Sequence, residues 1–158
     1  MVCLPPMSNT KLLGLAILCC TATLHADLSP VEQAAGWKEL SAAAGNFKAY
    51  KQAGFPTKGW TLKDGVLFHA AKGGGGDILT TEQFGDFELA FEFKTGAKAN
   101  SGIMYRVAET LDTPWMTGPE YQVLDDAGND LKPDDAHSTG ACYDLISPSG
   151  AKPMKPAG

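Results

Sequence analysis

The chain has 158 residues and a formal net charge of −5, and this length is expected for one domain. The acidic balance, with no cluster of basic residues, argues against nucleic acid as a partner. Among the four cysteines, Cys3, Cys19 and Cys20 lie near the N-terminus. Cys142 is then the only cysteine in the remainder, so that part cannot form an internal disulfide.

The N-terminus has the order of a secretory signal peptide. Lys11 precedes an apolar run from Leu12 to Cys20, and small residues follow up to Ala26, as a signal requires. The run is shorter than the roughly 20 residues that cross a bilayer; a buried N-terminal helix is the alternative. We predict a signal peptide over residues 1–26, a polar leader over residues 27–36, and an exported (periplasmic or secreted) chain with no transmembrane helix after cleavage.

The next segment holds the best helix candidate, Pro30 to Ala44, which Gly36 interrupts. Strand patterns follow it. Trp60–Lys63 and Val66–His69 flank an Asp-Gly pair, and such a pair between apolar runs is a strong hairpin signal. We therefore predict a two-stranded hairpin at this place.

Further along, apolar and polar residues alternate with period two, which is typical of strands with one buried and one wet face. The apolar positions are Phe87, Leu89, Phe91 and Phe93, then Ile103, Tyr105 and Val107, then Tyr121 and Val123, then Tyr143 and Leu145. Short strands between turn residues predict an all-β, antiparallel sandwich or barrel. We assign residues 37–158 to one such domain. No strand follows the loop Ser147 to Gly158, which predicts an incomplete C-terminus.

Arg106 is the chain's only arginine, and it falls on the polar face of a predicted strand. A guanidinium is a planar fork suited to carboxylates, vicinal hydroxyls or an oxyanion. Gly102 lies on the same face, and we expect it to leave room there for a ligand. A solvated strand residue or a structural ion pair is the alternative.

Glu120 and Gln122 share one face of the next predicted strand, opposite Tyr121 and Val123. A carboxylate and an amide on one wall suit the recognition of sugar hydroxyls, or one acts as a base while the other orients. An ordinary wet face is the alternative.

An acidic loop follows and leads to His137, a candidate general acid or base. Its aspartates are Asp125, Asp126, Asp130, Asp134 and Asp135. Their spacing does not match an EF-hand, so a solvated loop is the first interpretation and a Ca²⁺ site the alternative. The sequence contains no His-x-x-x-His or Cys-x-x-Cys pair, and so no zinc site is predicted.

Five short motifs follow one another along the chain. They are Asp77 to Glu82, Phe84 to Leu89, Asn100 to Ile103 with Arg106, Gly118 to Val123, and Gly140 to Asp144. In this order they resemble the 3-keto-disaccharide hydrolase family, formerly called a domain of unknown function. The resemblance implies a concanavalin-like, glucanase-type jelly roll of two antiparallel sheets, in which members continue for several more strands.

The resemblance also implies cleavage of glycosidic bonds in 3-keto-glycosides. A base removes the C2 proton, which the C3 carbonyl acidifies; the aglycone then leaves C1 and water adds back. This route needs a base, an enolate stabiliser and a proton donor. Glu120 and His137 are the candidates for base and acid, and Arg106 or a divalent cation such as Ca²⁺ for the stabiliser. The residues expected to bind the carbohydrate substrate are Gln122, Tyr143, Asp125 and Trp115.

Other interpretations stay open. The same fold serves lectins, so a non-catalytic carbohydrate-binding domain would use the same polar face, with sugar stacking on Trp115 or Tyr121. A conventional glycosidase acting on unoxidised sugar is another alternative, and a non-functional fragment of a longer protein is a third.

Overall fold

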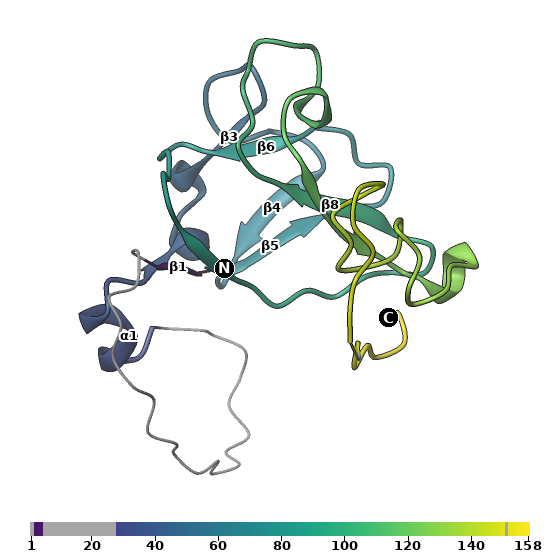
Figure 1. The fold of residues 1–158 in the computed structure, drawn as a ribbon. Coiled ribbons are helices and arrows are strands. Elements are labelled where there is room, and N and C mark those ends of the chain that lie inside the picture. The colour runs from purple at the N-terminus through teal and green to yellow at the C-terminus, as the bar shows by residue number, and fades with distance from the viewer. Residues whose placement is uncertain (1, 5–27, 151) are drawn as a thin grey trace. The chain divides into compact units, whose positions relative to one another are not determined.

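The computed structural model describes residues 2–4, 28–150 and 152–158 (Figure 1). Within these residues the regular structure consists of short strands, one five-residue helix and four 3₁₀ turns. Every strand pair among them is antiparallel, so the predicted all-β, antiparallel class is confirmed. The chain divides into two compact units, Met1–Phe91 and Glu92–Gly158. No helix in the described part is long and apolar enough to cross a membrane.

The first unit contains three small sheets with the strand orders β2-β1-β7, β3-β6 and β4-β5. Its elements in chain order are β1 (Val2–Leu4), α1 (Pro30–Ala34), β2 (Lys38–Glu39), η1 (Leu40–Ala42), η2 (Ala44–Asn46), β3 (Phe47–Ala49), β4 (Trp60–Lys63), β5 (Val66–His69), β6 (Ile78–Thr80) and β7 (Glu88–Ala90). β1 belongs to the segment predicted as a signal peptide. The rest of that segment lies outside the described residues, so the signal peptide stays a prediction.

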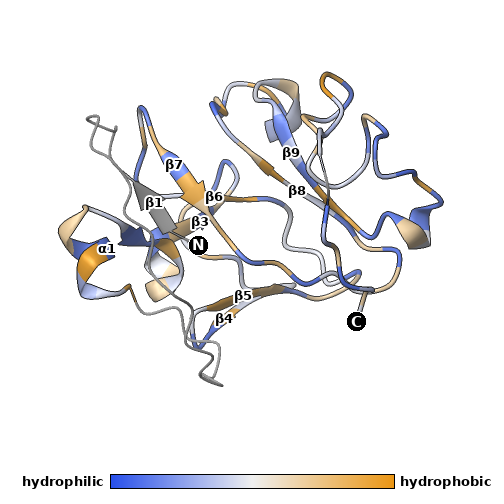
Figure 2. Ribbon diagram, turned by 60° about the horizontal axis from the view of Figure 1, so that its bottom comes forward, coloured by the Kyte–Doolittle hydropathy of each residue, from blue (hydrophilic) through white to orange (hydrophobic). Residues whose placement is uncertain are grey.

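Helix α1 is shorter than the sequence candidate and lies in the segment predicted as a leader. It begins with a capping box: the Ser29 hydroxyl accepts from the Glu32 amide at 3.3 Å, and the Glu32 carboxylate accepts from the Ser29 amide at 2.8 Å, which satisfies two helix-end donors. The helix stops before Gly36, whose φ is 87°, a conformation that favours glycine. None of its residues is buried, and Figure 2 shows both hydrophobic and hydrophilic colours on it.

The predicted hairpin is confirmed as β4 and β5. Trp60 pairs with His69 and Lys63 pairs with Val66, so two residues form the turn. Both have positive φ, 49° at Asp64 and 70° at Gly65, as a type I′ turn requires. The local Asp-Gly signal was sufficient here because the turn type alone fixes the register.

The strand predicted over Phe87 to Lys94 is present only in part. β7 covers Glu88–Ala90, because its hydrogen-bonded neighbour β1 is itself only three residues long. Phe87 and Phe93 are 38% and 37% exposed, so the alternating pattern does not place all four apolar side chains in a core.

The second unit is built around β9 (Glu120–Leu124), which has neighbours on both edges. β8 (Asn100–Met104) pairs with one edge, from Asn100 opposite Leu124 to Met104 opposite Glu120. On the other edge the Gln122 amide donates to the Ala141 carbonyl at 3.0 Å, and the Gly140 amide donates to the Gln122 carbonyl at 2.9 Å. Two 3₁₀ turns complete this unit, η3 (Pro114–Met116) and η4 (Ala127–Asn129).

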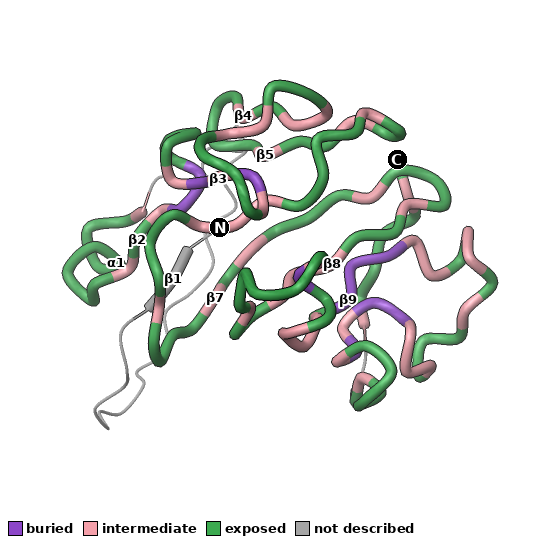
Figure 3. The backbone as a smooth tube through the Cα atoms, turned by 90° about the horizontal axis from the view of Figure 1, so that it is seen from above, coloured by how far each residue is buried: buried purple, intermediate pink, exposed green. Residues whose placement is uncertain are grey.

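Each unit has its own small set of buried residues, drawn in purple in Figure 3. In the first unit they gather on β3 and η1, with Phe47 at 4% and Leu40 at 7% exposed. In the second they gather on the C-terminal half of β9 and on the segment beside it, where Ser138 and Ala141 are fully buried. The second unit therefore encloses polar as well as apolar side chains.

A partly buried ion pair holds this polar interior together. The Lys152 ammonium lies 3.1 Å from the Asp126 carboxylate, with side chains 13% and 16% exposed, and it also donates to the Ser138 hydroxyl at 2.8 Å and the Thr139 carbonyl at 2.7 Å. Asp126 accepts from the Thr139 amide at 2.8 Å. The Thr139 hydroxyl donates to the Leu124 carbonyl and accepts from the Leu124 amide. The segment before Gly140 is thus fixed to the end of β9.

We expect Lys152→Met to lower the free energy of unfolding by about 3 kcal/mol, because it leaves the Asp126 carboxylate without its cation in a poorly solvated place. Lys155→Met is the matched control: Lys155 is exposed, and such a change costs within about 0.5 kcal/mol. Urea denaturation of the two variants measures the difference. Equal stability of the two variants would contradict the role given to the ion pair.

Candidate functional site

His137 lies in the segment that the ion pair fixes, and both of its ring nitrogens face carboxylates. Nδ1 is 2.9 Å from Asp135 Oδ1, and Nε2 is 3.2 Å from Asp144 Oδ1. The imidazole is 43% exposed, so solvent and small molecules reach it. A histidine held between two acceptors is oriented for proton transfer.

Asp135 contacts both the backbone amide and the ring of His137. Its Oδ1 accepts from the His137 backbone amide at 2.8 Å as well as facing the ring. These hydrogen bonds, first the one from the backbone amide and then the one from the ring, hold the pKa of the Asp135 carboxyl below its usual range, because both stabilise the ionised form.

Asp144 reaches the histidine from a separate turn. The Asp144 amide donates to the Ala136 carbonyl at 3.0 Å, and its φ of 58° is a left-handed conformation that aspartate tolerates better than most residues. Its side chain is 74% exposed. The second carboxylate is therefore placed by backbone contacts, with its side chain open to solvent.

Tyr143 connects this histidine to β9. Its ring meets the His137 ring edge-on, with centroids 4.9 Å apart, and its amide donates to the Glu120 carbonyl at 2.9 Å. The phenol ring is 41% exposed. Tyr143 thus contacts His137 through its ring and Glu120 through its backbone.

Glu120 begins β9, and its carboxyl group lies over Gly102 of β8. A Cβ atom on Gly102 would overlap that carboxyl group. The space that the sequence analysis reserved for a ligand at Gly102 is therefore filled by the Glu120 side chain, and this expectation is corrected. Glycine is needed there because only it admits the carboxyl so close to the neighbouring strand.

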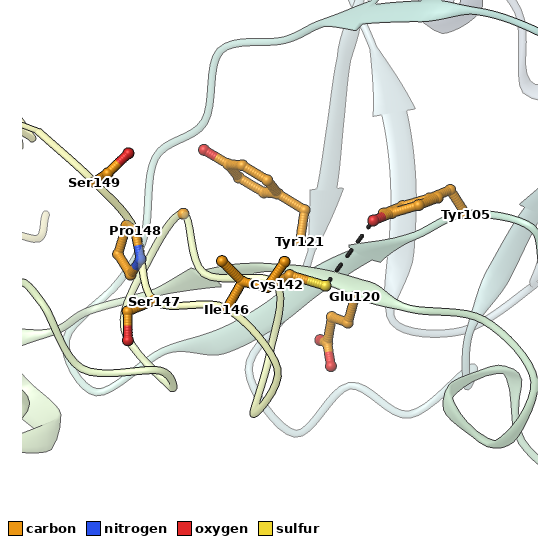
Figure 4. A pocket seen from close by; sticks show the side chains of 9 residues that line it. Tyr105, Glu120, Tyr121, Cys142, Ile146, Ser147, Pro148 and Ser149 are labelled. Atoms are coloured by element: carbon orange, nitrogen blue, oxygen red, sulfur yellow. Dashed lines mark hydrogen bonds between the residues drawn. The ribbon is translucent and has the colours of Figure 1, made fainter.

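A cavity of about 260 Å³ lies beside Glu120 (Figure 4). It is lined by Tyr105, Glu120, Tyr121, Gly140, Cys142, Ile146, Ser147, Pro148 and Ser149. The Tyr105 hydroxyl lies 4.0 Å from the Cys142 sulfur, and this contact is the main cause that raises the pKa of Tyr105. In Figure 4 the Glu120 carboxyl points away from the two tyrosine rings.

Two predicted site residues are placed differently from the expectation. Gln122 is not on a wet wall: it is 1% exposed, and its side-chain amide oxygen accepts from the Val123 backbone amide at 3.1 Å. Its own backbone pairs with Gly140 and Ala141 on the second edge of β9. Arg106 is not on a strand face either. β8 ends at Met104, and Arg106 is an exposed loop residue with a φ of 57°.

Two further predicted residues have clear local surroundings. Asp125 accepts from the backbone amides of Lys98 at 2.8 Å and Gly128 at 3.1 Å, so its carboxylate holds two loops together. Trp115 is 62% exposed on η3, where its indole face is open to stacking.

The acidic loop provides no assembled metal site among the described residues: no group of three or more His, Cys, Asp or Glu side chains there is arranged to hold a metal. Asp125, Asp126 and Asp135 instead accept hydrogen bonds from protein donors.

The two carboxylates around His137 were not assigned a role from the sequence. The spacing Asp135-x-His137 was a local signal for one of them, because a carboxylate two residues away can reach back to the histidine amide and ring. No local signal existed for Asp144, since its position depends on the turn that follows Cys142.

The second unit thus carries a histidine–carboxylate site on an all-β, antiparallel scaffold. The chain belongs to the family of 3-keto-alpha-glucoside-1,2-lyase-like domains, whose model matches residues 34–158. The family assignment made from the ordered motifs is confirmed.

Two relatives support this placement. A 3-keto-disaccharide hydrolase from Bacteroides thetaiotaomicron is 33% identical, over 68% of this chain and 44% of that protein. The crystal structure of a candidate glycosyl hydrolase from Parabacteroides distasonis is 28% identical with a TM-score of 0.61, over 84% of this chain and 65% of that one. The likeness agrees with the predicted β-sandwich. The chain spans less than half the length of the curated relative.

We expect Gly102→Ala to destabilise the protein by about 1–3 kcal/mol, because the new methyl group would displace the Glu120 carboxyl. Adding Glu120→Ala should recover most of that loss, since close residues are coupled. Gly96→Ala is the control, because a Cβ there meets no atom within 4 Å. Thermal denaturation of the wild type, the single variants and the double variant measures these differences in stability. If Gly102→Ala destabilises the protein as much in the Glu120→Ala background as in the wild type, the contact is refuted.

Proposed function

We propose that this chain carries the site of a hydrolase or lyase that cleaves the glycosidic bond of 3-keto-glycosides. The observation that carries the proposal is His137, held between Asp135 and Asp144 and joined through Tyr143 to Glu120. The membership of the family, and the names of the two relatives, support an enzyme acting on glycosidic bonds.

The chemistry fits the groups present. In a 3-keto-glycoside the carbonyl at C3 acidifies the hydrogen on C2, so a single base can remove it and form an enolate. The electron pair then forms the C1–C2 double bond as the C1–oxygen bond breaks, and the aglycone oxygen takes a proton. Addition of water, OH to C1 and H to C2, completes a net hydrolysis. This route needs one base and one acid and not a pair of opposed carboxylates.

Residues of the second unit provide the base, the acid, the enolate stabiliser and the substrate contacts. Glu120 and His137 are the proton-transferring pair, and the Tyr143 phenol is a hydrogen-bond donor for sugar hydroxyls. Trp115 offers an exposed face for stacking. Arg106 stabilises the enolate oxygen electrostatically. Gln122 is omitted from the substrate contacts because it is buried.

Export is part of the proposal. The charge, apolar run and small residues of the first 26 residues support a secretory signal, and a periplasmic or secreted location suits an enzyme that acts on carbohydrate outside the cytoplasm.

A lectin-like domain is the second candidate function. It is favoured by the cavity between Tyr105 and Tyr121 and by the exposure of Trp115, because aromatic faces bind sugar rings without any chemical step.

We expect the full chain to release aglycone from a 3-keto-glucoside and not from the matching unoxidised glucoside, because only the keto sugar has an acidic C2 hydrogen. Chromatography of both reactions measures release. His69→Gln is a control variant that should keep the wild-type rate, since its ring contacts Trp60 and Gly74 in the first unit. Cleavage of the plain glucoside would favour a conventional glycosidase, and binding of both sugars without cleavage would favour the lectin-like function.

A further inference from the structure

We propose that His137 is the proton donor to the departing aglycone, that Asp135 and Asp144 are the positioning residues that hold it in this role, and that Glu120 is the base. The inference rests on the proposed function. It decides which member of the proton-transferring pair gives the proton and which takes it.

Both ring nitrogens of His137 lie beside carboxylate oxygens. Nδ1 lies 2.9 Å from a carboxylate oxygen of Asp135, and Nε2 lies 3.2 Å from one of Asp144. An ionised carboxylate only accepts hydrogen bonds, whereas a neutral imidazole has one N–H and one lone pair. Both contacts are satisfied together only when both nitrogens carry hydrogen, and in that form the ring gives a proton and cannot take one.

The two carboxylates beside the imidazole are not equivalent. Asp135 is fixed by the ring and by the His137 amide, so Nδ1 is the anchored nitrogen. Asp144 makes the longer contact and is 74% exposed. A substrate oxygen can replace it at Nε2 without breaking a buried interaction. The transferable hydrogen is thus the one on Nε2.

The other charged and titratable groups around the histidine agree with this assignment. Lys132 acts on Asp135 and favours its ionised form. Tyr143 meets the ring from the same turn as Asp144, and Glu120 lies next to Tyr143 through a backbone hydrogen bond.

The Glu120 carboxyl is held over Gly102, where the absence of a Cβ atom gives it room, and the Glu120 backbone carbonyl accepts from the Tyr143 amide. A carboxylate is an acceptor, which suits removal of the C2 hydrogen.

Glu120 takes the C2 hydrogen, and the electron pair left on C2 forms the C1–C2 double bond as the C1–oxygen bond breaks, with the electrons of that bond on the aglycone oxygen. That oxygen receives the Nε2 hydrogen of His137. The proton on Glu120 exchanges with solvent before water adds. Water then places its OH on C1 and gives its other proton to His137, while Glu120 delivers a solvent-derived hydrogen to C2. The substrate is already oxidised at C3, so no oxidant is consumed.

The test uses leaving groups that differ in their need for protonation. Two 3-keto-glucosides with the same sugar are compared, one with a methyl and one with a 4-nitrophenyl aglycone. Nitrophenolate leaves without a proton, whereas methoxide does not. We expect His137→Gln to slow methyl release by about 100-fold or more, the usual scale of general acid catalysis, and to leave nitrophenyl release nearly unchanged. Glu120→Gln should slow both by a similar factor.

A second pair of variants tests whether Asp144 positions His137. Asp144→Asn should slow methyl release more than nitrophenyl release, whereas Asp134→Asn, an exposed change in the same loop region, should affect neither. An equal loss on both substrates in His137→Gln, or a loss in Glu120→Gln confined to the methyl substrate, overturns the assignment.

A wild-type chain that releases neither aglycone instead overturns the proposed function, and so the two failures are distinguishable. A measurement that needs no variant keeps the inference falsifiable if His137→Gln does not fold. Nitrogen-15 spectra of the His137 ring in the wild-type chain near neutral pH should show both nitrogens protonated, and a neutral ring would refute the inference.

Discussion

The second unit depends on the ion pair between Lys152 and Asp126. Both side chains are withdrawn from solvent, and such a pair is stable only when the remaining donors and acceptors are also satisfied. Ser138, Thr139 and the end of β9 satisfy them. Because His137 immediately precedes these buried residues, a polar network with no chemical role of its own fixes where the exposed imidazole lies.

The site is assembled by close backbone approach, and no large cleft is needed for it. Gly102 lets the Glu120 carboxyl lie against the neighbouring strand, and the Tyr143 amide joins the following turn to the same β9 residue. Asp144 sits in a left-handed conformation at the point where its carboxylate meets the ring. Sparsely populated backbone conformations persist when their surroundings over-determine them, and the hydrogen bond from Asp144 to Ala136 is part of that constraint.

Local patterns in the sequence predicted the elements whose geometry is local. The Asp-Gly turn fixed the β4–β5 hairpin, and the alternation around Ile103 and Tyr121 predicted strands where β8 and β9 lie. The burial of Gln122 could not be predicted, because alternation along a strand shows which residues share a face and not which face the rest of the chain covers. The predicted place of Arg106 failed since periodicity does not show where a strand ends, and the contact between His137 and Asp144 needed the turn after Cys142.

The most direct test of the account is the fate of the C2 hydrogen when the full chain cleaves a 3-keto-glucoside in D₂O. The account predicts deuterium at C2 of the released sugar from the first turnover, at a rate that matches aglycone release and exceeds exchange in the same sugar kept without protein. Aglycone release that leaves the original hydrogen on C2 would contradict removal of that proton, and with it the elimination route.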